Sequence, residues 1–152
     1  MPRPHPDQTG VPKGFKRCVV CRETRPLVEY YTYLRNAGGL THFCKDCGRK
    51  RSVLYTTEAR AKKKGVPFTL TAADLSFPET CPICDEVLVR GEKKGESSAP
   101  SVDRIIPSLG YVPENIIIIC MRCNIRKSTS SPEDMIRIAE FFLRLRKDRG
   151  LC

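Results

Sequence analysis

The stretch between residues 81 and 127 decides the fold of this chain. It begins with CPIC (Cys81 to Cys84), continues through SVDRI (Ser101 to Ile105) and PENIIII (Pro113 to Ile119), and ends with CMRCNIRK (Cys120 to Lys127). Two CxxC pairs separated by a hairpin-like segment are typical of a zinc site, because this short spacing suits tetrahedral coordination. Four thiolates leave no open coordination position, so we expect this zinc to be structural.

The cysteines extend the same pattern over the chain. Eight of the nine form four CxxC pairs, and Cys152 is left over. We expect two structural zinc ions rather than disulfides, because a two-residue gap strains a disulfide bridge. Reduced thiolates predict a cytoplasmic protein, and no apolar run approaches the roughly 18 residues of a membrane span. The predicted zinc ligands are Cys18, Cys21, Cys44, Cys47, Cys81, Cys84, Cys120 and Cys123.

The order of parts is the same around both cysteine quartets: a knuckle, a hairpin and then a helix. We therefore predict a small, zinc-stabilised α+β protein that contains two related modules. The first covers residues 17–65 and follows a disordered tail over residues 1–16. A linker with a short helix covers residues 66–80. The second module covers residues 81–150 and includes a flexible loop near residues 91–100 and a carboxy-terminal helix.

Local patterns place the expected elements. In the first module we expect strands over residues 29–34 and 40–43, and then a long basic helix that ends near Gly65. In the second module we expect strands over residues 102–106 and 116–119. Four consecutive isoleucines predict that the last of these is covered on both faces. Ser131 followed by proline and acids predicts a helix start, and the apolar face of this helix is expected to pack on the second module.

The charge of the chain favours a polyanionic partner. The formal net charge is +10 and the sequence pI is about 9.3. The alternative is a charge excess that only aids solubility, but the positive residues are clustered, which favours nucleic acid. The residues that we expect to contact its backbone are Arg49, Lys50, Arg51, Lys62, Lys63, Lys64 and Lys127.

The residues from Ser101 to Ser128, framed by two CxxC pairs, resemble the HNH endonuclease family. More closely, they resemble HNH-like proteins of bacteriophages that carry an S-x-D-R-I…G-Y-V…N…N-x-x-K-S signature, often behind an amino-terminal CxxC…CxxC module. The resemblance extends from about residue 15 to 145. It implies a ββα-metal, treble-clef-like module and a phage or prophage endonuclease that hydrolyses DNA, most readily double-stranded, in a bacterial or phage-infected cell.

The resemblance also implies roles for single residues. Asp103 matches the acidic ligand of a catalytic divalent ion, and Asn124 matches the last metal-binding position of the motif. Asn115 matches the middle asparagine, which braces the loop. Lys127 lies one turn after Asn124 and is expected to hold a phosphate. Mg²⁺ or another hard divalent cation suits the carboxylate and amide oxygens of this set.

One position departs from the family pattern. Arg104 stands where the family has its general-base histidine, and arginine stays protonated in proteins. We expect Arg104 to stabilise charge in the transition state instead. The departure keeps a second hypothesis open, in which the chain is a catalytically weak or inactive zinc protein that binds nucleic acid. Read alone, Asp103 also fits a surface acid, Asn115 a loop residue and Asn124 a helix cap. The sequence leaves the oligomeric state open.

The zinc hypothesis predicts a stoichiometry. Elemental analysis of the purified chain should find about two zinc ions per chain, one for each cysteine quartet. Cys84→Ser should unfold the second module, because zinc binding supplies much of the folding energy of such modules. Cys152→Ser is the matched control and should leave stability unchanged. A content of one zinc ion would contradict the assignment of the amino-terminal module.

Overall fold

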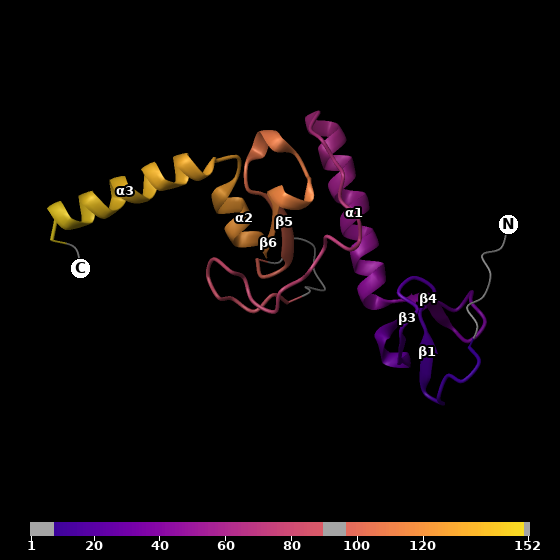
Figure 1. Cartoon of the computed structure of the whole chain (residues 1–152). Helices are drawn as coiled ribbons and strands as arrows, with labels where there is room; N and C mark the ends of the chain where they lie inside the picture. The colour runs from indigo at the N-terminus through magenta and orange to yellow at the C-terminus, as the bar shows by residue number, and fades with distance from the viewer. Residues whose placement is uncertain (1–7, 90–96, 151–152) are drawn as a thin grey trace. The chain divides into compact units, whose positions relative to one another are not determined.

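The computed structural model describes residues 8–89 and 97–150 of this chain. It divides into two units, residues 1–55 and 56–152, each of which contains one of the predicted cysteine quartets. Both units are small and mixed α+β, and each strand pairs with one antiparallel partner (Figure 1). Helix α1 (Lys45–Lys64) crosses the boundary between the units. The α+β fold class predicted from the sequence is confirmed, and the two cysteine quartets are placed so that each could hold a zinc ion.

The first unit consists of two hairpins and the start of α1. Strand β1 (Phe15–Arg17) pairs with β2 (Thr24–Pro26), and a short 3-10 turn leads to β3 (Tyr30–Thr32), which pairs with β4 (Leu40–Cys44). The core of this unit is the buried side chains of Cys18, Tyr30 and Cys44. The β3–β4 hairpin lies where the sequence predicted it. The sequence analysis predicted no strand at β1 or β2, each of which is only three residues long.

The second unit is built around one β-ribbon and the helix that follows it. Strand β5 (Pro100–Arg104) pairs antiparallel with β6 (Ile116–Cys120), so that Pro100 lies opposite Cys120 and Arg104 lies opposite Ile116. Helix α2 (Met121–Lys127) begins directly after β6 and contacts both strands (Figure 1). Ile119 is fully buried among the cysteines of this unit. The arrangement is the ββα order expected for the module.

The connection from β5 to β6 is held by the segment that follows α1. It contains two 3-10 turns, η2 (Pro107–Leu109) and η3 (Pro113–Asn115). Between the turns, Tyr111 donates its N–H to the carbonyl of Pro67 at 2.8 Å and accepts from the N–H of Thr69 at 3.0 Å. This short parallel pairing anchors an otherwise irregular loop, so the loop keeps its backbone groups bonded.

Some expectations differ from the structure, and others fall on residues outside the described ranges. Residues 1–7 and 90–96, parts of the predicted tail and flexible loop, lie outside the described residues, but Gln8 already accepts a hydrogen bond from the N–H of Arg17. Thr71 to Asp74 forms a hydrogen-bonded turn instead of the start of a helix, since Pro78 follows too soon for a stable one. Ile117 is 36% exposed, because a two-stranded ribbon has too few neighbours to cover both faces.

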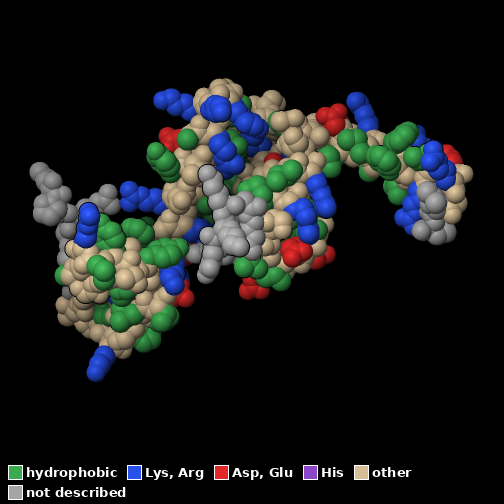
Figure 2. Space-filling model, turned by 180° about the vertical axis from the view of Figure 1, so that it is seen from behind, with side chains coloured by type: hydrophobic (Ala, Val, Ile, Leu, Met, Phe, Trp, Pro, Cys, Tyr) green, Lys and Arg blue, Asp and Glu red, His purple; other side chains and the backbone are tan. Residues whose placement is uncertain are grey.

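Helix α3 (Pro132–Asp148) begins as predicted. The Ser131 hydroxyl accepts from the N–H of Asp134, and the carboxylate of Asp134 accepts from the N–H of Ser131, which forms a reciprocal capping box. The expected packing of its apolar face is not found: no residue of α3 is buried among the described residues, and Phe142 is 60% exposed. Figure 2 shows such apolar side chains at the surface. No helix in the described ranges is long and apolar enough to cross a membrane.

Gly110 gives a testable requirement of the β5–β6 connection. It has a φ of 78°, and a Cβ there would lie 2.4 Å from the carbonyl oxygen of Pro67. Gly110→Ala should therefore lower the free energy of unfolding by about 3 kcal/mol, measured by urea denaturation of the zinc-loaded chain. Gly65→Ala is the matched control, because its φ is 62° but nothing lies within 4 Å. An equal loss for both variants would contradict the close approach at Gly110.

Candidate functional site

The four cysteines of the second unit form the frame of the site. The ligand atoms of Cys81, Cys84, Cys120 and Cys123 all lie within 4.8 Å of one another. A tetrahedral zinc with Zn–S bonds near 2.3 Å requires sulfurs about 3.8 Å apart. The Sγ atoms of Cys84 and Cys120 are 3.7 Å apart, which fits that geometry. The quartet therefore has the spacing of a closed structural zinc site.

Backbone N–H groups are directed at these sulfurs. The N–H of Cys120 donates to Sγ of Cys81 at 3.4 Å, and the N–H of Cys123 donates to Sγ of Cys120 at 3.3 Å. Burial opposes ionisation of Cys81, but its backbone donors outweigh burial and lower its pKa to about 6. Burial raises the pKa of Cys123 to about 12. A cation at the centre would make all four thiolates compatible, because it offsets their mutual repulsion.

The first unit repeats this arrangement. Cys18, Cys21, Cys44 and Cys47 also bring their ligand atoms within 4.8 Å of one another, and Sγ of Cys18 lies 3.8 Å from Sγ of Cys47. Burial raises the pKa of Cys18, but donation from backbone N–H groups outweighs it and gives a pKa of about 7. Among the described residues, the structure therefore brings together two groups of potential metal ligands, and they are the two cysteine quartets predicted from the sequence.

A polar layer lies between β5 and α2. Ser101 and Asp103 are two residues apart on β5, so their side chains lie on the same face of the strand. Asn124 and Lys127 are three residues apart on α2 and so also lie on one face. The amide of Asn124 donates to Oγ of Ser101 at 2.6 Å. The ammonium of Lys127 lies 3.0 Å from Oδ2 of Asp103. The packing of helix on ribbon therefore brings the two predicted metal ligands, Asp103 and Asn124, to one interface.

The oxygens of this layer fit a hard divalent cation. Asp103 is only 6% exposed, and its Oδ2 atom has the ammonium of Lys127 as its charge partner. Asn124 uses its Nδ2 on Ser101, which leaves its Oδ1 as an acceptor. A buried carboxylate oxygen and an amide oxygen are ligands that Mg²⁺ and Mn²⁺ accept. The chemistry of the donor set thus matches the divalent ion expected from the sequence.

Asn115 fixes the loop that follows Asp103. Its Nδ2 donates to the carbonyls of Ile106 at 2.9 Å and Gly110 at 2.8 Å, while its Oδ1 accepts from the N–H of Ile106 at 2.9 Å. Its own carbonyl accepts from the N–H of Ile105 at 2.8 Å. With 4% exposure, Asn115 uses nearly its whole hydrogen-bonding capacity on the backbone. Together with the pairing of Tyr111, this side chain therefore holds the loop beside the site.

Arg104 lies on the other face of β5. Its guanidinium stacks over the ring of Tyr111, 5.1 Å from the ring centroid, and donates to the carbonyl of Pro107. Arg60 contacts the same ring, 5.8 Å from its centroid. Arg104 is 8% exposed, so its guanidinium contacts Tyr111 and Pro107 rather than solvent. The role of Arg104 in stabilising a transition state stays a prediction, and its contacts are those of a structural residue.

Two partners at the site were not predicted. The notable one is the contact of Lys127 with Asp103, since the sequence suggested only a phosphate contact for that lysine. The second is Ser101, which holds the amide of Asn124. Period-two alternation from Asp103 would have placed Ser101 on the same face, and the i, i+3 spacing from Asn124 would have placed Lys127 there.

The basic residues predicted to bind nucleic acid lie mostly on α1. Lys62, Lys63 and Lys64 at its end are exposed, and so is Arg51 nearer its start. Lys50 is partly buried and forms an i, i+4 ion pair with Asp46 at 4.0 Å. Exposed cations without a fixed geometry suit contacts to a phosphate backbone, which need charge more than precise placement.

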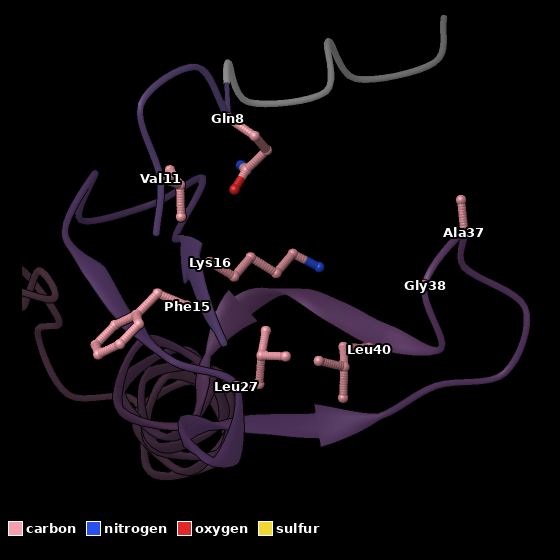
Figure 3. A pocket seen from close by; sticks show the side chains of 8 residues that line it. All are labelled: Gln8, Val11, Phe15, Lys16, Leu27, Ala37, Gly38 and Leu40. Atoms are coloured by element: carbon pink, nitrogen blue, oxygen red, sulfur yellow. The ribbon is translucent and has the colours of Figure 1, made fainter. Parts of the chain in front are cut away.

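A hollow of about 380 Å³ lies in the first unit (Figure 3). Apolar side chains such as Phe15, Leu27 and Leu40 line it around the stem of Lys16. The ammonium of Lys16 donates to the carbonyl of Thr41 at 2.9 Å and lies 5.5 Å from the ring centroid of Tyr30. Its polar group is thus already used, and the hollow contains none of the predicted site residues.

Comparisons with known proteins support the fold. No family model matches this chain, and no curated protein matches it. The structure is similar to that of PacI, a rare-cutting HNH restriction endonuclease that perturbs DNA, with a TM-score of 0.50 and 23% sequence identity. The match covers 90% of this chain and 99% of that one. The predicted resemblance to the HNH endonucleases is therefore confirmed at the level of the fold.

The bracing role of Asn115 can be tested with a nearly isosteric change. Asn115→Asp replaces an amide that donates to two carbonyls by an oxygen that repels them, so the free energy of unfolding should fall by about 2–3 kcal/mol. Thermal unfolding of the zinc-loaded chain measures this loss. Asn36→Asp is the matched control, since Nδ2 of Asn36 donates to a single, part-buried carbonyl. A smaller loss at position 115 than at position 36 would contradict the bracing role.

Proposed function

We propose that this chain is a metal-dependent HNH-type endonuclease that hydrolyses phosphodiester bonds of DNA. The observation that supports this most directly is that the buried carboxylate of Asp103 lies at the interface where α2 presents Asn124. The likeness of the fold to an HNH restriction endonuclease agrees with it. Burying a carboxylate is costly even beside a charge partner, which favours a function for Asp103.

In this proposal Asp103 and Asn124 hold the divalent cation. Such a cation, when bound, stabilises the negative charge that develops on the scissile phosphate. β5 and α2 fix the two ligands on rigid elements, and the cysteine quartet fixes the junction between β6 and α2. Asn115 keeps the loop after Asp103 in place through its bonds to Ile106 and Gly110. The protein thus contributes a preorganised set of oxygens, which needs little rearrangement during the reaction.

We assign Arg104 to positioning rather than to chemistry. It faces away from Asp103 along β5 and is fixed by Tyr111 and Pro107. The second unit, residues 56–152, contains no histidine. Loss of a general base typically lowers a rate about 10²–10⁴-fold, so we expect slow cleavage. The water-activating group is therefore not an imidazole of this unit.

Double-stranded DNA is the partner that we propose for the basic side chains. The exposed cations of α1, together with the net charge of +10, favour a polyanion over a protein partner. Lys127 lies next to the proposed cation site and would meet a phosphate bound there. Contacts of this kind carry no sequence information and set affinity and orientation.

One observation favours a second candidate function. The ammonium of Lys127 already neutralises Asp103, so this carboxylate has a charge partner without any divalent ion. A zinc protein that binds nucleic acid without cleaving it would have the same fold and the same charge. The cleavage experiment below separates the two functions.

The proposal predicts cleavage that depends on Asp103. The zinc-loaded chain should nick supercoiled plasmid slowly when Mg²⁺ or Mn²⁺ is present, and Asp103→Ala should reduce the rate about 100-fold or more. Asp148→Asn, which removes an exposed carboxylate near the end of α3, is the control and should keep the wild-type rate. Thermal unfolding confirms that each variant is folded. Equal cleavage by wild type and Asp103→Ala would contradict the proposal. DNA binding without cleavage would favour the second function.

A further inference from the structure

Lys127 reaches from the last turn of α2 back to the strand that carries Asp103. Its ammonium lies 3.0 Å from Oδ2 of Asp103 and donates a hydrogen bond to the carbonyl of Arg104 at 2.7 Å. The side chains of Asp103 and Lys127 are only 7% and 14% exposed. A charge pair this well shielded from water interacts strongly, unlike an ion pair on the surface.

The ammonium stands beside the oxygen that a divalent cation would use. The ammonium of Lys127 is 3.0 Å from Oδ2 of Asp103, so it already occupies one approach to this oxygen. A divalent cation on this oxygen would lie next to the ammonium. Like charges at such a distance disfavour each other, so the two cations cannot both keep their best positions.

We propose that Lys127 is a resident counter-ion of Asp103, which the divalent cation must displace when it binds. This inference rests on the proposed function, because it concerns the same cation site. It assigns to Lys127 a role in setting the affinity of the site for its metal ion, in addition to the phosphate contact expected from the sequence.

Of the two partners, Lys127 is the one that can move. Asp103 is fixed because β5 is paired along its whole length with β6, where it lies opposite Ile117. Lysine carries its charge on a flexible four-carbon stem with three rotatable donors. The ammonium that leaves Asp103 stays within reach of the site, where a phosphate would offer it a new charged partner. Displacement therefore moves a positive charge from the carboxylate toward the substrate.

The test compares cation binding by the full-length, zinc-loaded chain and its variants. Lys127→Met should bind Mn²⁺ about tenfold more tightly than wild type, about 1.4 kcal/mol, measured from free Mn²⁺ by electron paramagnetic resonance. Without a divalent ion, the same variant should unfold at a lower temperature, because Asp103 is then buried without a partner. Mn²⁺ should raise its unfolding temperature more than that of wild type.

Two further variants keep the test decisive. Lys127→Gln keeps a donor for the carbonyl of Arg104 but removes the charge, so it should also bind Mn²⁺ more tightly and serves if the methionine variant does not fold. Lys147→Met removes an exposed lysine of α3 and should bind Mn²⁺ as wild type does. If wild type binds Mn²⁺ and neither variant at position 127 binds it more tightly, this inference is overturned while the proposed function stands. If no form of the chain binds Mn²⁺, both are overturned.

Discussion

The meeting of four thiolates in the second unit is the constraint on which its geometry depends. Cys81 and Cys84 come from the knuckle, and Cys120 and Cys123 come from the junction between β6 and α2. This small unit buries few large side chains, and a metal ion held by the quartet would supply what a larger core would otherwise provide. With the junction fixed, α2 can lie only where its side chains meet β5. The candidate site is therefore a product of the quartet, although no cysteine belongs to it.

The loop between β5 and β6 shows how a short irregular segment can be as well defined as a strand. Asn115 bonds three backbone groups within it, and Tyr111 pairs with the chain near Pro67. The ring of Tyr111 also makes cation–π contacts with the guanidinium groups of Arg104 and Arg60. An arginine at the position where related motifs have a histidine thus belongs to the framework of this loop. Arg104 is 8% exposed, so little of it lies at the surface.

The sequence predicted those features that local chemistry determines. The CxxC spacing specified both quartets, and Ser131 with the following proline and acids specified the start of α3. Features that depend on tertiary packing could not be predicted from the sequence. The pairing of Lys127 with Asp103 follows only once α2 is placed on β5, and the exposure of Ile117 follows from the number of strands. A run of isoleucines indicates burial but cannot say how many layers provide it.

Helix α3 has a consequence for the distribution of stability along the chain. None of its apolar side chains is fully buried, so each gains only part of the roughly 1.5–3 kcal/mol that full burial gives a large apolar residue. What holds it is local: the capping box at Ser131 and an exposed ion pair between Asp134 and Arg137 at 3.9 Å. A 17-residue helix supported in this way is close to the length at which isolated helices become marginal in water. Its amide hydrogens should therefore exchange with solvent well before those of the ribbon beneath α2.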